Sequence, residues 1–209
     1  MEVCRKILAS GAASLNLNLT DAHLEQLLNF IKLIEKWNKA YNLTAIKNRE
    51  DMAMLHILDS LAIIPYLEGT RVVDIGTGAG LPGIPLAICL PDIHFTLLDS
   101  NAKKTRFVQQ VVLELKLKNV EVIHNRVENV HPEQGYDAVL TRAFAGLTDI
   151  VKLTAHLQAK DGVLLAMKGQ IPDAELEGIT ATVIPISIPG ADVERCLVRI
   201  QSLKQAEVS

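Results

Sequence analysis

A glycine-rich segment with two nearby acids is the part of this sequence best suited to bind a small molecule. The segment 72–85 reads VVDIGTGAGLPGIP, in which an apolar strand leads to Gly76, Gly78 and Gly80 and then to a proline-marked helix start. Because glycine costs backbone entropy, this spacing indicates that a ligand approaches the main chain closely. A strand, a glycine turn and a helix N-terminus together form an anion- or cofactor-binding corner.

Three nucleotide-type interpretations compete for this corner. A P-loop needs a lysine and a hydroxyl residue after the last glycine, where this chain has Leu81 and Pro82. The stretch 78–83, GAGLPG, fits the G-x-G-x-x-G spacing of a dinucleotide site. However, Asp74 lies inside the strand, and Pro82 and Pro85 remove amide donors that a pyrophosphate would use. S-adenosylmethionine, a cofactor without phosphates, fits these residues better.

S-adenosylmethionine requires main-chain atoms near its amino-acid end, an acid near its ammonium group and an acid at its ribose hydroxyls. We expect the three glycines and Asp74 to meet the first two needs. Asp99 follows the next predicted strand, about 20 residues beyond the glycines, as ribose recognition requires. Asp99 could instead cap the helix that begins AKKTRF, although Ser100 or Asn101 could take that role.

Polar residues also follow the third and fourth predicted strands, at the sheet edge where ligands bind in open α/β folds. Arg126, Val127 and Glu128 follow the third strand and could either contact adenine or form a solvated turn. Arg142 follows the fourth strand and could either act in the site or form an ion pair between domains.

Alternating strands and helices would position these residues in the second part of the chain. Strands are expected over 71–75, 94–98, 120–124, 136–141 and 162–167, and helices over 101–116 and 147–158. This alternation implies right-handed βαβ units and a parallel sheet. The last two apolar segments, 179–189 and 194–202, have hairpin-like spacing, so the final pairing should be antiparallel.

The first part of the chain, residues 1–66, predicts a helical extension to an α/β domain over 67–209. One helix should begin after an N-cap at Thr20 and Asp21 and end within WNKAYNLT (37–44), and a second should cover about 49–58. No apolar run reaches the ~18 residues of a membrane span. Three widely spaced cysteines favour reduced thiols in the cytoplasm and no metal site. The formal net charge of −3 means that any nucleic-acid surface must be local.

Seven segments, taken in order, resemble the ribosomal small-subunit RNA methyltransferase G family, also called glucose-inhibited division protein B. They are WNKAYNLTAI, HILDSLAI, VVDIGTGAGLPGIPLAI, FTLLDS, NRVENV, TRAFAGL and AMKGQ. The resemblance implies a class I, Rossmann-like methyltransferase sheet of seven strands with an antiparallel last strand. It also implies S-adenosylmethionine-dependent N7-methylation of one guanine in 16S ribosomal RNA. The cofactor contacts that it implies fall on Gly76, Leu81, Val127, Glu128 and Arg142.

Guanine N7 has an in-plane lone pair and no proton, so its methylation needs no general base. Catalysis can then consist mostly of positioning and the exclusion of water. This agrees with the sequence, in which His56, His124 and His131 are scattered and suggest no catalytic dyad. Cys89 lies in the apolar segment LAICLP and is expected in the core, which disfavours a covalent cysteine mechanism.

Two residues are the candidates for catalysis and RNA positioning. Arg142 is expected to donate to a guanine or phosphate oxygen, or to fix the cofactor end of the site. Lys168 could position RNA, or it could be a solubilising lysine on an edge strand. The residues expected to contact RNA phosphates beside the cofactor are Lys39, Asn42, Lys103, Lys104 and Arg106, with Lys32 and Lys36 in the same group. Each could also belong to an ordinary solvated helix face.

The expected partner is 16S ribosomal RNA within a partly assembled small ribosomal subunit, bound by a monomer in the cytoplasm, with no membrane involved. The acidic net charge suggests a weak grip on isolated RNA. Three alternatives stay open: a class I methyltransferase for a small molecule, an NAD-dependent oxidoreductase, and a non-catalytic ribosome-associated regulator. The prolines at the helix start argue against the oxidoreductase.

Overall fold

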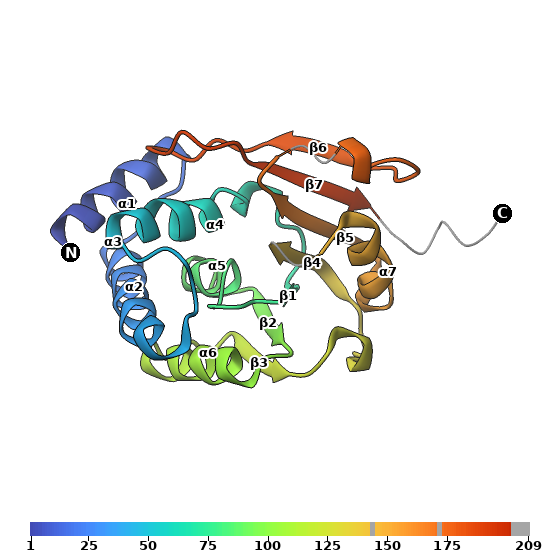
Figure 1. Ribbon diagram of the computed structural model, residues 1–209, viewed down its shortest axis with the longest axis horizontal. Helices are drawn as coiled ribbons and strands as arrows, with labels where there is room; N and C mark the ends of the chain where they lie inside the picture. Colours follow the sequence, from blue (N-terminus) through green and yellow to red (C-terminus); the bar gives the residue numbers. More distant parts are fainter. Residues whose placement is uncertain (143–144, 171–172, 202–209) are drawn as a thin grey trace.

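The computed structural model describes residues 1–142, 145–170 and 173–201, and it contains one seven-stranded sheet in the order β3-β2-β1-β4-β5-β7-β6 (Figure 1). The strands are β1 (Arg71–Ile75), β2 (His94–Asp99), β3 (Val120–His124), β4 (Tyr136–Arg142), β5 (Gln158–Lys168), β6 (Thr182–Pro185) and β7 (Cys196–Gln201). Pairing is parallel from β3 to β5, and β7 is antiparallel to both β5 and β6. The predicted sheet and its antiparallel end are confirmed.

Different helices cover the two faces of the sheet. Helices α5 (Gly83–Cys89) and α6 (Ala102–Glu114) belong to one hydrophobic cluster, and α7 (Leu147–Thr154) belongs to the other. Successive strand residues alternate between them: Val72 and Leu97 join the first cluster, and Val73 and Leu98 join the second. Strands β1, β2 and β4 are therefore buried on both faces, which explains why they appear in the sequence as apolar runs.

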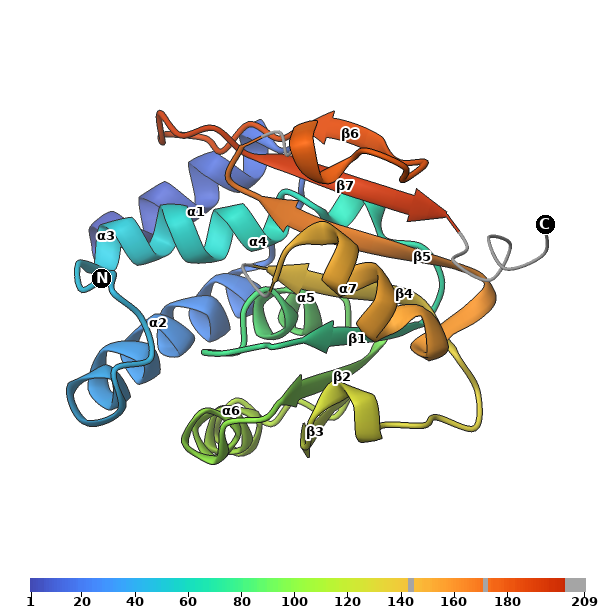
Figure 2. The same cartoon turned by 45° about the vertical axis from the view of Figure 1, so that its right-hand side comes forward.

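The N-terminal helices pack into the first of these clusters. They are α1 (Glu2–Ser14), α2 (Asp21–Tyr41), α3 (Arg49–Met52), the π-helix η1 (Ala53–Leu58) and α4 (Asp59–Leu61). At the start of α2 the Thr20 hydroxyl accepts from the His23 amide at 3.2 Å, which confirms the predicted N-cap. The helix ends inside the predicted segment, where Asn42 adopts φ 50°. Helices α1 to α4 lie on the side toward which the arrowheads of β1, β4 and β5 point (Figure 2).

The structure differs from the sequence prediction at several elements. The second N-terminal helix contains the π-turn η1, a feature often found at functional sites. Helix α7 is shorter than predicted because a 3₁₀ turn, η4 (Ala155–Leu157), leads directly into β5. Strands β6 and β7 are shorter than the segments 179–189 and 194–202. Residues 143–144 of TRAFAGL, and residue 202 of the second predicted segment, lie outside the described residues.

Three further 3₁₀ turns complete the chain: η2 (Ile64–Tyr66), η3 (Val127–Asn129) and η5 (Asp173–Glu175). Over the described residues, no helix combines the length and hydropathy needed to cross a membrane. The carboxyl ends of β1 to β5 form one sheet edge, and the N-termini of α5, α6 and α7 follow from it. Ligands of open α/β sheets bind at such an edge.

Candidate functional site

The glycine turn after β1 leaves open space above its backbone. Gly76, Gly78 and Gly80 have φ values of 67°, 60° and 80°, which L side chains rarely adopt. A Cβ added at Gly78 would meet nothing closer than the Gly76 carbonyl oxygen, at 3.8 Å. The amides of Gly76 and Thr77 both donate to the Leu98 carbonyl, at 2.8 and 3.0 Å. The turn is thus fixed to β2 while its outer face stays accessible to a ligand.

Asp74 holds the two ends of this turn together from inside. Its Oδ2 accepts from the Thr77 hydroxyl at 2.7 Å and from the Gly83 amide at 3.0 Å. Its Oδ1 is buried and has no hydrogen-bond partner among the described residues. Burial raises the pKa of Asp74 to about 6, against the effect of the two hydrogen bonds. One oxygen therefore supports the loop, and the other is a buried acceptor that no described residue satisfies.

Asp99, at the end of β2, links the glycine turn to the start of α6. Its Oδ2 accepts from the Gly78 amide at 2.9 Å, and its Oδ1 accepts from the Asn101 amide at 2.8 Å. The cap of α6 is Asn101, whose side chain accepts from the Lys103 and Lys104 amides. Asp99 is therefore not the helix cap. It lines the adjacent cavity, and each of its oxygens, which accepts one amide, has a second lone pair for a ligand.

A cavity of about 480 Å³ opens at the carboxyl ends of β1, β2 and β3. Its lining residues are Ile75, Gly76, Leu98, Asp99, Ser100, Lys104, Asn125, Arg126, Val127, Glu128 and Leu153. Four of the predicted cofactor contacts therefore share one cavity: Gly76, Asp99, Val127 and Glu128. The other predicted cofactor contacts are not among its lining residues: Asp74, Gly78, Gly80, Leu81 and Arg142.

A second cavity of about 370 Å³ lies at the carboxyl ends of β4 and β5. Its lining residues are Ile46, Leu55, His56, Asp59, Arg142, Met167, Lys168, Gly169 and Arg195. The two residues predicted for catalysis, Arg142 and Lys168, are thus brought together. Five of these nine residues come from the N-terminal extension and from the segment before β7, and the sequence analysis assigned none of the five to the site.

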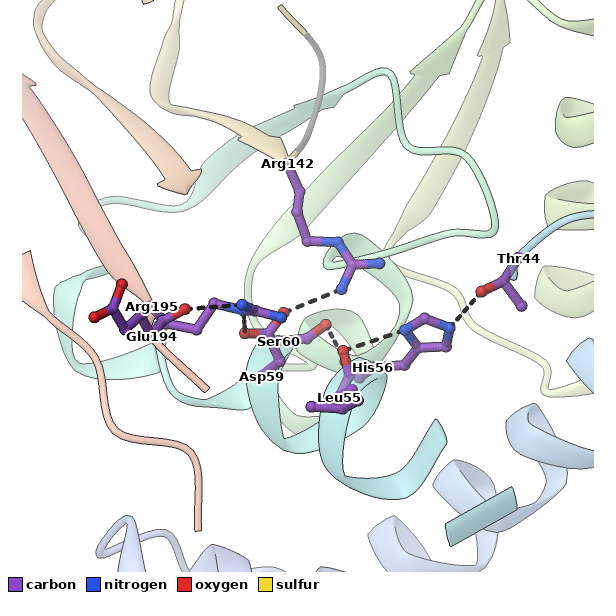
Figure 3. Close-up of polar contacts among 8 residues, drawn as sticks. All are labelled: Thr44, Leu55, His56, Asp59, Ser60, Arg142, Glu194 and Arg195. Atoms are coloured by element: carbon purple, nitrogen blue, oxygen red, sulfur yellow. Dashed lines mark hydrogen bonds and ion pairs between the residues drawn. The ribbon is translucent and has the colours of Figure 1, made fainter. Parts of the chain in front are cut away.

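A buried carboxylate organises this second cavity (Figure 3). Asp59 is only 2% exposed, and its two oxygens accept from Arg142 Nη1 at 3.1 Å and Arg195 Nε at 3.2 Å. Burial raises the pKa of Asp59, and the two arginines oppose that increase. An ion pair, one of the two roles considered for Arg142, is therefore present, and it joins β4 to helix α4. It also fixes the guanidinium at the cavity, so the two roles are compatible.

His56 lies beside Arg142 and is held neutral by its surroundings. Its Nε2 is 2.8 Å from the Thr44 hydroxyl, and its Nδ1 is 3.2 Å from the Leu55 carbonyl oxygen. A carbonyl can only accept, so this contact assigns the proton to Nδ1 and makes Nε2 the acceptor. Burial, followed by the charge of Arg142, lowers the pKa of His56 to about 4. The imidazole is therefore uncharged near neutral pH.

Lys168 lies at the end of a central strand. Because β5 pairs with both β4 and β7, the alternative of an edge-strand lysine is wrong. Its Nζ donates to the Ala145 carbonyl and to Glu175 Oε2, both at 3.0 Å. Glu175 also accepts from the Leu147 amide, which opens α7. The lysine thus ties the cavity rim to α7.

The predicted RNA contacts divide between the two ends of α6. Helix α2 runs antiparallel to α6, since Gln26 donates to the Leu115 carbonyl at one end and Trp37 packs against Phe107 at the other. Lys39 and Asn42 continue toward the start of α6, the end that carries Lys103, Lys104 and Arg106. Lys32 and Lys36 instead lie beside Glu114 and Leu115, so their predicted place near the cofactor mouth is wrong.

The thiols are poorly placed for chemistry. Cys4 and Cys196 are buried, and Cys89 is half-buried in α5. Burial raises the pKa of Cys89 to about 12, so it is a protonated thiol at neutral pH. This supports the expectation that no cysteine nucleophile takes part.

Comparison with known proteins decides the family. The model of the family described as rRNA small subunit methyltransferase G matches residues 23–198. This chain belongs to that family. A relative from Legionella pneumophila named ribosomal RNA small subunit methyltransferase G is 50% identical over 200 residues, covering 95% of each chain. One of the same name from Chromobacterium violaceum is 50% identical over 199 residues, covering 92% of this chain and 95% of its own.

Solved structures support the fold of this methyltransferase G family member. A SAM-dependent methyltransferase from Aquifex aeolicus aligns with a TM-score of 0.55 at 18% identity, over 72% of this chain and 93% of its own. TYW2 from M. jannaschii, solved in complex with AdoMet, aligns with a TM-score of 0.52 at 19% identity, over 69% of this chain and 73% of its own. At these identities the similarity establishes the class I methyltransferase architecture.

Proposed function

We propose that this chain transfers a methyl group from S-adenosylmethionine to N7 of one guanine in 16S ribosomal RNA of the small ribosomal subunit. The observation that carries the proposal is the cavity at the ends of β1 to β3, where Gly76, Asp99, Val127 and Glu128 converge. Family membership connects this cavity to methyl transfer and to ribosomal RNA.

The residues present fit S-adenosylmethionine. The open backbone at Gly78 provides room for close approach, and Asp99 reaches the same cavity from β2. The unpaired Oδ1 of Asp74 suits a ligand with a donor group, such as the ammonium of the cofactor. When bound, this cofactor supplies an electrophilic methyl group on a cationic sulfur.

The protein's own contribution is positioning. Guanine N7 carries a free lone pair, so no side chain has to remove a proton before the methyl group is transferred. His56, which lines the second cavity, is neutral, buried and bonded through both ring nitrogens, as expected where no base is needed. Arg142 and Lys168 are held in place by Asp59 and Glu175 and can donate to oxygens of the RNA.

We also propose the division into an extension over 1–66 and a methyltransferase domain over 67–209, with a monomer acting in the cytoplasm. The RNA surface would consist of the exposed Lys39, Asn42, Lys103 and Arg106 together with Lys104, which lines the cofactor cavity. A net charge of −3 favours recognition of an assembled subunit, where shape and protein contacts add to phosphate binding.

Methyl transfer from tritiated S-adenosylmethionine tests the function. Substrates are small ribosomal subunits from cells lacking this gene, naked 16S RNA, and subunits from cells that have the gene. We expect label on the first, less on the second and none on the third. Asp99→Asn should lose cofactor affinity and activity, whereas Asp92→Asn, an exposed acid before β2 at the opposite sheet edge, should retain both.

Two results would contradict the proposed function. Cofactor binding without label on any RNA would overturn the RNA substrate and favour a small-molecule methyltransferase or a non-catalytic regulator. No binding of the cofactor by the wild-type protein would overturn the assignment of the cavity itself.

A further inference from the structure

The second cavity lies beside the proposed cofactor cavity and is built differently. Arg142, at the end of β4, borders it, and β4 pairs directly with β1, which carries the glycine turn. The charge of Arg142 also acts on Asp74 of β1. The two cavities therefore lie next to each other on one sheet edge, as a cofactor and its methyl acceptor must.

The polar groups of this cavity are mostly hydrogen-bond donors. Arg142, Lys168 and Arg195 are cationic, and Asp59 is the only acid among the described residues that line it. Both Asp59 oxygens are already taken by the arginines. Within the described part of the chain, Arg142 bonds only through Nη1, and Arg195 only through Nε and Nη1. Each arginine therefore keeps at least its Nη2 group for a ligand that accepts.

The rest of the lining is apolar. Ile46 and Leu55 come from the N-terminal extension, and Met167 comes from β5. A volume of about 370 Å³ lies near the lower end of the range for small-molecule sites, which suits one flat base better than a long ligand. A cavity whose lining combines apolar side chains with a few cationic donors matches a nucleobase that presents oxygen or nitrogen acceptors along one edge.

We propose that this cavity receives the target guanine, flipped out of its RNA stack, and that Arg142 and Arg195 read its O6 oxygen. Asp59 is then a positioning residue that aims both guanidiniums, and Arg195 is a specificity-determining residue. This inference rests on the proposed function and adds how the base is chosen. Enzymes that modify a base commonly extrude it into a fitted pocket.

The donor set explains a choice between purines. Guanine and adenine share the N7 acceptor, but guanine has an oxygen at position 6 where adenine has an amino group. An arginine side chain can only donate hydrogen bonds. It can therefore donate to guanine O6, but it cannot pair with the amino group of adenine, which is also a donor. Donation to O6 also leaves the N7 lone pair free to form the new bond to the methyl carbon as the carbon–sulfur bond breaks.

Base analogues test the role of O6 without altering the protein. Subunits are reconstituted with guanine, inosine or 2-aminopurine at the target position, and methyl transfer to each is measured. Inosine keeps O6 and N7, so its kcat/KM should stay within about tenfold of that of guanine. The base 2-aminopurine keeps N7 and lacks O6, and its kcat/KM should fall at least about 100-fold below that of inosine. Similar rates on inosine and 2-aminopurine would overturn the proposal.

An arginine variant tests which side chain reads that oxygen. Arg195→Met should lower kcat/KM on inosine subunits about 10- to 100-fold, and cofactor affinity, measured by calorimetry, should not change. On 2-aminopurine subunits the same variant should cause little further decrease, because the oxygen that it contacts is already missing. Arg199→Met, in the neighbouring strand β7, is the matched control: it removes an ion pair between Arg199 and Glu68 and should leave all three substrates unaffected.

The outcomes separate this inference from the proposed function. If Arg195→Met lowers the rate by the same factor on both analogues, Arg195 acts structurally and its proposed reading of O6 is wrong. If the wild-type protein methylates no guanine subunit although the cofactor binds, the proposed function itself fails.

Discussion

The protonation of His56 gives a prediction whose size follows from the structure. The imidazole is 5% exposed, and burial together with Arg142 lowers its pKa from 6.5 to about 4. In the unfolded chain this histidine binds a proton near pH 6.5, and in the folded protein it does so only near pH 4. The unfolded state therefore gains protons first as the pH falls, and the free energy of unfolding decreases over this interval.

The free energy of unfolding should decrease by about 2 kcal/mol between pH 7 and pH 4.5. The complete pKa shift of His56 corresponds to about 3 kcal/mol. The assay is urea unfolding of the wild-type protein and of His56→Gln at both pH values. Glutamine can still accept from Thr44 and does not titrate. The wild type should lose about 2 kcal/mol more than the variant over this range.

The difference between the wild type and His56→Gln also removes the opposing pH dependence that Asp74 contributes. Asp74 has a raised pKa, so it stabilises the folded state at low pH, and this stabilisation is lost as the pH rises through about 6. It is present in both proteins and cancels in the difference. Parallel pH dependences for the wild type and His56→Gln would refute the reasoning, because they would mean that His56 titrates normally in the folded protein.

Three further predictions concern the glycine turn and the RNA surface. In Gly83→Ala, the new methyl would lie 2.1 Å from Leu97 Cδ2, so we expect about 1–3 kcal/mol of destabilisation in urea unfolding. In Gly78→Ala the new methyl meets open space, but the positive φ should lower the free energy of unfolding by about 1–2 kcal/mol. The same variant should bind the cofactor at least tenfold more weakly, as measured by calorimetry. Unchanged affinity would show that the turn is not part of the cofactor site. Replacing Lys103 and Arg106 by glutamine should make subunit binding less sensitive to salt. In a plot of log binding constant against log salt concentration, the slope should become shallower by about 0.7 for each phosphate that the variant no longer neutralises. An unaltered slope would show that neither side chain binds phosphate.

The strands and the first cavity could be predicted because their signals are local. Strand β1 was predicted with its observed bounds, since an apolar run followed by glycines marks both the strand and its turn. The beginning of β5 was missed, because Lys160 and Asp161 are exposed and polar and the register shifts opposite Tyr136 and Ala138. Polar residues in a strand give no periodic signal, and only the pairing with β4 reveals them.

The second cavity could not be predicted as a unit. Arg142 and Lys168 were identified from their positions at strand ends, but their partners lie far away in sequence. Asp59 is 83 residues from Arg142 and 136 residues from Arg195, and only the packing of the N-terminal helices against the strand ends joins them. A buried carboxylate shared by two arginines is a tertiary arrangement. HILDS and VERC carry no local pattern that links them.

The most direct test of the account is the position of the modified base. Small subunits from cells lacking this gene would be incubated with the protein and S-adenosylmethionine, and the 16S RNA treated with borohydride and aniline, which cleaves at 7-methylguanine. The account predicts cofactor-dependent cleavage at one guanine. Methyl label in the RNA without such cleavage, or cleavage spread over many guanines, would contradict it.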